Sequence, residues 1–150
     1  MAAVGRHADR GSESGQAILE LAFTLPLLLV LVTGIFDFGL MFQRYEVVTN
    51  AAREGARIAV LPNYTAADAQ TRVQTYLTAS GLTNTAPTAD VTFGTETTPS
   101  GQTFPDVKVT AYYPSGFLIL GPIAKLVGGT GYSTITLAAS AVMRVESAGS

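Results

Sequence analysis

One apolar stretch near the N-terminus constrains this chain more than any other feature. Residues 21–36, LAFTLPLLLVLVTGIF, contain no charged side chain, and after Asp37 the apolar run continues to Phe42. As a helix, residues 21–42 would be roughly 33 Å long, enough to cross the hydrocarbon core of a bilayer, which is about 30 Å thick. The run is longer than the apolar region of a secretory signal, and no Ala-x-Ala cleavage site follows it. We therefore predict a membrane anchor rather than a cleaved signal peptide or a buried core helix.

Composition limits the chemistry available to the rest of the chain. The 150 residues carry a net charge of −2, with no cysteine and a single histidine, His7. No basic block indicates nucleic-acid binding, and the lack of cysteine excludes disulfides and thiolate metal sites. Four acidic residues that follow the long helix are scattered, with no spacing that would bring them together: Asp68, Asp90, Glu96 and Asp106. We therefore expect no enzyme activity, metal, cofactor or small-molecule substrate.

Two helices are expected around the end of the apolar stretch. Small apolar residues recur at spacings of three and four over residues 47–59, so the first helix should continue to about Leu61 and end before Pro62. Thr65 and Asp68 are typical of a capping box at the start of a second helix. The residues on the core-facing side of that helix would be Ala69, Val73, Tyr76 and Leu77, with Gly81 as its stop.

Alternating apolar residues predict three strands, over residues 89–93, 107–113 and 135–145. Residues 94–103, GTETTPSGQT, should form a polar loop between the first two strands. The apolar cluster at 117–127 is too short to span a bilayer; it is either a broken helix covering the sheet or a surface that docks on a membrane or partner. The expected class is α+β: a long membrane-embedded N-terminal helix, then a three-stranded antiparallel sheet with one or two packed helices.

A short motif lies where the polar leader meets the apolar helix. Gly15 is followed by four residues and then by Glu20. This arrangement resembles the processing site of type IV pilins, where a prepilin peptidase cuts after the glycine on the cytoplasmic face. The resemblance implies cleavage between Gly15 and Gln16, and pairing of Glu20 with the N-terminal amine of a neighbouring subunit. Such pairing is physically reasonable, because a buried carboxylate is tolerated when a cation neutralises it.

A second motif identifies a narrower family. Residues 49–57, TNAAREGAR, look like the N-A-A-R-E-G-A-R signature of the TadE-like family, and residues 137–146, LAASAVMRVE, resemble its closing strand. Members of this family are minor pilin-like proteins of tight adherence (Tad) pilus systems. One departure is Leu21, where pilins of these systems commonly have an aromatic residue.

The resemblance implies three parts: a cytoplasmic leader cleaved from the chain (1–15), a transmembrane and extended N-terminal helix (16–62), and an extracytoplasmic domain (63–150). The implied function is that of a pilin-like (pseudopilin) structural or assembly subunit of a Tad or type IV-like pilus, stored in the cytoplasmic membrane. Its partners would be the membrane, the prepilin peptidase, other pilin or pseudopilin subunits and the pilus assembly platform. The alternative is an uncleaved, single-pass membrane-anchored binding module.

Four charged residues are further candidates for subunit contacts. Asp37 lies within the apolar run, where an unpaired charge facing lipid is costly; it either lies at the membrane interface or meets another subunit. Arg53, Glu54 and Arg57 fall opposite the small apolar residues of the same helix, and Glu54 can pair with Arg57 across one turn. This group forms either a solvated face or a contact with a partner subunit.

Overall fold

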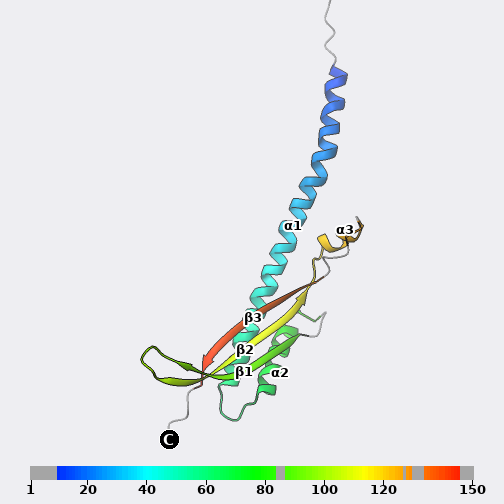
Figure 1. Ribbon diagram of the computed structural model, residues 1–150. Helices are drawn as coiled ribbons and strands as arrows, with labels where there is room; N and C mark the ends of the chain where they lie inside the picture. Colours follow the sequence, from blue (N-terminus) through cyan, green and yellow to red (C-terminus); the bar gives the residue numbers. More distant parts are fainter. Residues whose placement is uncertain (1–9, 84–86, 127, 130–133, 146–150) are drawn as a thin grey trace, which may run out of the picture.

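The computed structural model describes residues 10–83, 87–126, 128–129 and 134–145. A long helix, α1 (Arg10–Ala59), projects from a small head at the other end of the molecule (Figure 1). The head contains, in chain order, α2 (Ala66–Ala79), β1 (Thr88–Thr97), β2 (Thr103–Ser115), α3 (Leu120–Leu126) and β3 (Ile135–Arg144). The expected α+β class, with its long N-terminal helix and three-stranded antiparallel sheet, is confirmed.

Helix α1 has two halves with different surroundings. Among the described residues it is the one helix long and apolar enough to cross a membrane, and its most apolar part is not covered by the rest of the molecule. The helix begins at Arg10, so Gly15 lies inside it rather than before it, and it ends at Ala59, slightly before the expected Leu61. Its second half carries the head.

The sheet is a simple meander in the order β1-β2-β3, with antiparallel pairing throughout. The second half of α1 packs across β2 and β3, and α2 packs beside α1 over β1, so both helices cover the same face (Figure 1). In the centre of the sheet Val109 lies opposite Val91 on one side and Ala141 on the other. The fully buried side chains come from both layers: Val48, Ala51, Ala52, Ala56, Ala69, Val73, Leu77, Val107, Val109 and Ala111.

Helix α2 follows its sequence signals closely. The Thr65 side chain accepts a hydrogen bond from the backbone N–H of Asp68, and the Asp68 carboxylate accepts one from the backbone N–H of Thr65, which completes the predicted capping box. Just past the end of the helix Gly81 has φ +83°, a conformation that glycine adopts at little cost.

Two expectations for the loops are wrong. Residues 94–97 and 103 are paired in the β1–β2 hairpin, so only residues 98–102 form its tip; β-branched threonines suit a strand even where no apolar face is buried. The helix within residues 117–127 does not cover the sheet. Helix α3 lies beyond the end of the sheet and beside α1 (Figure 1), because polar groups of α1 hold it there.

Candidate functional site

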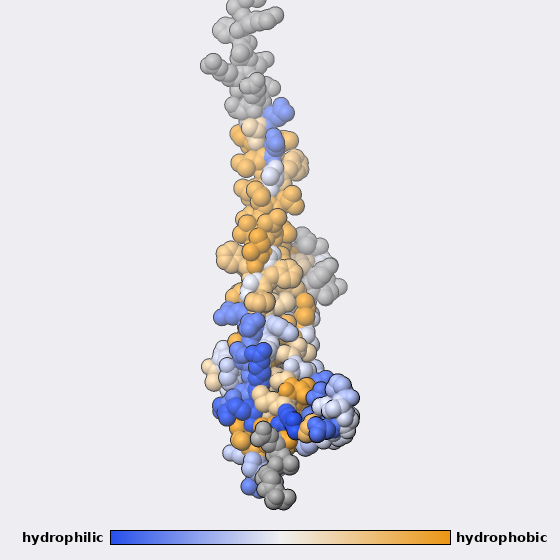
Figure 2. Space-filling model, turned by 90° about the vertical axis from the view of Figure 1, so that its left-hand side faces the viewer, coloured by the Kyte–Doolittle hydropathy of each residue, from blue (hydrophilic) through white to orange (hydrophobic). Residues whose placement is uncertain are grey.

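The first half of α1 presents large apolar side chains to its surroundings on all sides. Figure 2 shows a hydrophobic surface along this part of the helix and a mainly hydrophilic head below it. Phe23, for example, is 76% exposed and Leu27 is 71% exposed. An apolar surface this continuous is unfavourable in water and marks contact with a membrane or another protein. This half of the helix is therefore the principal interaction surface of the chain.

The predicted processing and pairing residues lie at the start of this surface. Gly15, Gln16 and Glu20 are all exposed in α1, and a Cβ added at Gly15 would meet nothing within 4 Å. The Glu20 backbone carbonyl accepts a hydrogen bond from the Thr24 hydroxyl at 2.8 Å. Its carboxylate has no partner among the residues that the structure describes. Glu20 is thus available to a cation supplied from outside the subunit.

Asp37 is buried by its own subunit, with 3% of its surface exposed. Its carboxylate accepts hydrogen bonds from the backbone N–H groups of Leu118 at 3.0 Å, Ile119 at 3.1 Å and Leu120 at 2.7 Å. Leu120 is the first residue of α3 and Leu118 and Ile119 directly precede it, so Asp37 of α1 supplies acceptors for N–H groups at the start of this helix. Intramolecular bonds therefore account for the burial of Asp37, and no second subunit is needed for it.

Arg44 is a functional candidate that sequence reasoning missed. Its guanidinium Nη1 donates to the Ser115 Oγ at 2.8 Å and to the Gly116 carbonyl at 3.0 Å. Asp37 and Arg44 lie seven residues apart, which places them on one face of the helix two turns from each other. Both hold the segment between β2 and α3. Their spacing is the only signal in the sequence, and it does not indicate which segment of the chain they contact.

The charged residues further along α1 join it to α2. The Arg57 guanidinium donates to both Glu54 carboxylate oxygens, at 2.7 and 2.9 Å, as predicted. Arg72 of α2 also donates to Glu54, with 3.0 Å between its Nε and the Glu54 Oε1. Hydrogen bonds from Arg57 and then Arg72 lower the pKa of Glu54 to about 2. Arg53 is exposed and has no partner within the described part of the chain, so it is the member of this group that is not engaged within the described subunit.

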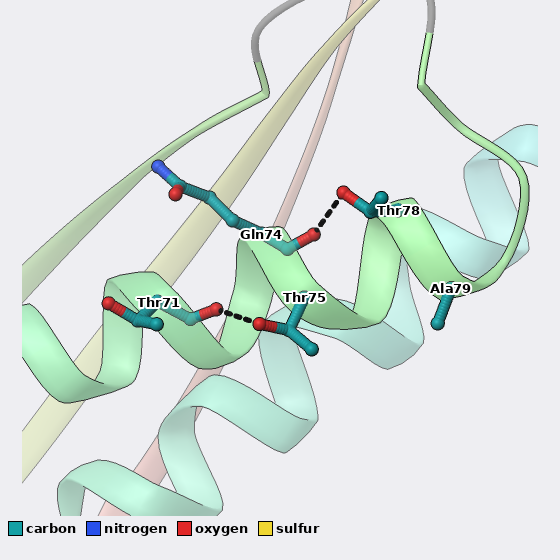
Figure 3. Close-up of a pocket in the computed structure, with 5 residues that line it drawn as sticks. All are labelled: Thr71, Gln74, Thr75, Thr78 and Ala79. Carbon is teal, nitrogen blue, oxygen red and sulfur yellow. Dashed lines mark hydrogen bonds between the residues drawn. The ribbon is translucent and has the colours of Figure 1, made fainter.

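A shallow groove of about 480 Å³ runs along the outer face of α2, lined by Thr71, Gln74, Thr75, Thr78 and Ala79 (Figure 3). The hydroxyls of Thr75 and Thr78 donate to backbone carbonyls one turn earlier, each at 2.8 Å, so their protons are not free for a ligand. Over residues 10–83, 87–126, 128–129 and 134–145, no cluster of His, Asp and Glu could hold a metal ion.

An exposed apolar N-terminal helix that continues into a small α+β head defines a class of protein anchored at its N-terminus. Residues 15–57 carry a TadE-like domain: they match the family described as TadE-like protein. The family resemblance drawn from the motifs is thereby confirmed over these residues, and it indicates a Tad pilus-associated protein with an N-terminal hydrophobic helix. Searches of curated proteins and of solved structures give no match to the chain.

Proposed function

We propose that this chain is a pilin-like subunit of a Tad pilus, stored in the cytoplasmic membrane with its head outside, cleaved after Gly15 and assembled through α1. The observation that carries the proposal is that the exposed apolar half of α1 lies within the TadE-like domain. In the membrane this surface contacts lipid; in a filament the same surface packs against the helices of neighbouring subunits. No catalytic step by this chain is part of the proposal.

Cleavage would require the helix to open around Gly15, since the site lies inside α1. The local sequence lowers the cost of opening the helix there. Glycine costs about 1 kcal/mol relative to alanine in a helix interior, and residues 11–15, GSESG, contain two glycines and two serines. A peptidase can therefore unwind this end without disturbing the apolar residues that follow.

After cleavage Gln16 would supply a new amine at the start of the helix. Glu20 would then be the fifth residue of the cleaved chain, one turn along the helix from the new amine. In a filament the unpartnered Glu20 carboxylate would be neutralised by the amine of an adjacent subunit. Leaving one member of such a buried pair without its partner is costly. The Glu20 charge would therefore favour packing in which the amine of the adjacent subunit lies next to it.

The decisive test is the N-terminal residue of the protein isolated from its own cells, determined by intact mass or terminal sequencing. The proposal expects a start at Gln16 in the wild type, the full-length chain for Gly15→Leu, and normal processing for the control Gly34→Ala. Both glycines lie in α1 with nothing within 4 Å of an added Cβ. A wild-type start at Met1 or Ala2 would contradict cleavage.

Assembly is tested separately with Glu20→Gln, which keeps the size and shape of the side chain and removes its charge. We expect this variant to be processed and membrane-embedded but depleted from sheared surface filaments. Glu46→Gln is a matched control, because Glu46 is exposed on the same helix close to the head. Equal incorporation of both variants into filaments would show that Glu20 has no role in assembly.

The alternative function is an uncleaved membrane-anchored binding module outside the cytoplasm. One observation favours it: α1 is continuous from Arg10 through Gly15, with no break at the processing motif. In that case the chain would keep its leader in cells, and Gly15→Leu would change neither the N-terminal residue of the isolated protein nor the surface pili.

A further inference from the structure

We propose that residues 117–123 insert into the headgroup layer of the same membrane that holds α1, as a second and shallower anchor on the head side. The inference rests on the membrane embedding of α1 in the proposed function. It does not depend on cleavage after Gly15 or on filament assembly.

The first argument concerns depth. Residues 16–37 of α1 would cover roughly 33 Å along the helix axis, close to the thickness of the hydrocarbon core. With Gln16 at one boundary, Asp37 lies at the other. Its carboxylate binds the backbone N–H groups of Leu118, Ile119 and Leu120, so these residues are held at the level where hydrocarbon meets headgroups.

The second argument concerns what this segment exposes. Leu118 is 61% exposed and Ile123 is 38% exposed, although the residues between them contact α1. The Phe117 ring packs edge to face on Phe38 of α1, with 6.2 Å between ring centroids, and Phe38 is itself 62% exposed. The apolar surface of the segment is therefore continuous with the lipid-facing surface of α1. Lys125, exposed at the end of α3, provides a cation for lipid phosphates.

The third argument is that the segment does not serve the core of the head. Residues 117–123 lie beyond the end of the sheet (Figure 1), and none of the side chains in the buried core belongs to them. Two polar groups of α1 nevertheless hold the segment: Asp37 binds it at residues 118–120, and Arg44 binds Ser115 and Gly116, which directly precede it. Fixing an apolar segment beside a membrane helix, away from the core, is what shallow insertion requires.

The test uses the full chain reconstituted in vesicles of phosphatidylethanolamine and phosphatidylglycerol. Because the protein has no cysteine, a single cysteine can carry an environment-sensitive fluorophore at Leu118→Cys, where the side chain is exposed and the Asp37 bond uses the backbone. Leu28→Cys, within the apolar half of α1, is the membrane control. Thr95→Cys, exposed on β1 near the hairpin tip, is the aqueous control.

Quenching by spin-labelled lipids gives the depth of each fluorophore. We expect lipids labelled near the headgroup to quench the Leu118 probe several-fold more than the Thr95 probe, and lipids labelled deep in the chain to quench mainly the Leu28 probe. Adding Asp37→Ala should reduce quenching at Leu118 and leave it unchanged at Leu28.

Each other outcome overturns the inference in a distinguishable way. A Leu118 probe as poorly quenched as Thr95, with Leu28 still quenched, would exclude the shallow anchor and leave the embedding of α1 intact. Absence of quenching at Leu28 would refute the embedding, and both proposals with it. A third outcome is that the emission of the Leu118 probe is blue-shifted although lipids do not quench it, and that the shift is lost when the protein is diluted with lipid. This outcome would show that a second copy of the chain covers the segment instead.

Discussion

Replacing Gly55 by alanine tests whether close packing of α1 on the head holds the two together. Gly55 is buried in α1, beside Val73 of α2 and Val109 of β2. A Cβ at this position would lie 2.5 Å from the Val73 Cγ2 and 3.1 Å from the Val109 Cγ1. Neither valine can move aside readily, because both are fully buried and β-branched side chains have restricted rotamers.

The expected magnitude combines two opposing effects. An extra methyl group in a packed core costs about 1–3 kcal/mol. A distance of 2.5 Å is far inside the optimal carbon–carbon separation of about 3.5–4.0 Å, so the upper end of that range applies. In the opposite direction, alanine is more favourable than glycine in a helix interior by about 1 kcal/mol. The head should therefore lose about 2 kcal/mol of stability, which for a domain of this size lowers Tm by about 8–16 °C.

Thermal unfolding of the full chain in detergent micelles, followed by near-ultraviolet circular dichroism of the tyrosines, measures this loss; the chain has six tyrosines and no tryptophan. Gly39→Ala is the matched control, since the same change on the same helix meets nothing within 4 Å. In a Val73→Ala background, where the obstructing methyl is gone, Gly55→Ala should cost much less. If Gly55→Ala unfolds at the same temperature as Gly39→Ala, close packing at this point does not limit stability.

Two other predictions concern the polar contacts of α1, with Glu46→Gln as the control for both. Glu54→Gln should lower head stability by about 0.5–1 kcal/mol, because the pairs with Arg57 and Arg72 are partly exposed. Since the pKa of Glu54 falls from 4.5 to about 2 on folding, wild-type denaturation should show a contribution lost between those pH values and missing in the variant. Asp37→Ala should speed hydrogen exchange of amides 118–120; unchanged exchange would mean that the cap does not order α3.

The features that sequence reasoning predicted correctly depend on near neighbours. The apolar run, the Thr65–Asp68 capping box, the Glu54–Arg57 pair and the alternation along β2 each need only residues a few positions apart. Local geometry is set by local sequence in these cases, since helical and extended periodicities follow from the backbone alone. The Gly15–Glu20 motif is local in the same way, and its processing and pairing roles stay predictions.

The features that were missed depend on contacts between distant residues. Leu118 is 81 positions from Asp37, and Ser115 is 71 positions from Arg44; neither pairing has a signature in the sequence. The two alternatives for residues 117–127 could not be separated for the same reason, because an apolar cluster does not indicate which surface it contacts. The structure excludes the first of them, since α3 does not cover the sheet. The contact between Arg72 and Glu54 likewise depends on tertiary structure, because it requires α2 to pack beside α1.

By itself, then, the sequence determined that the chain is anchored by an N-terminal apolar helix, that its head is α+β, and which residues resemble a pilin processing site. The tertiary structure alone decided that Asp37 and Arg44 hold the start of α3 beside α1, and that Gly55 packs against Val73 of α2 and Val109 of β2. The physical reason is that periodicity and capping act within a few residues along the chain. The partner of a buried polar group, by contrast, is chosen by whichever donors the folded chain brings within hydrogen-bonding distance.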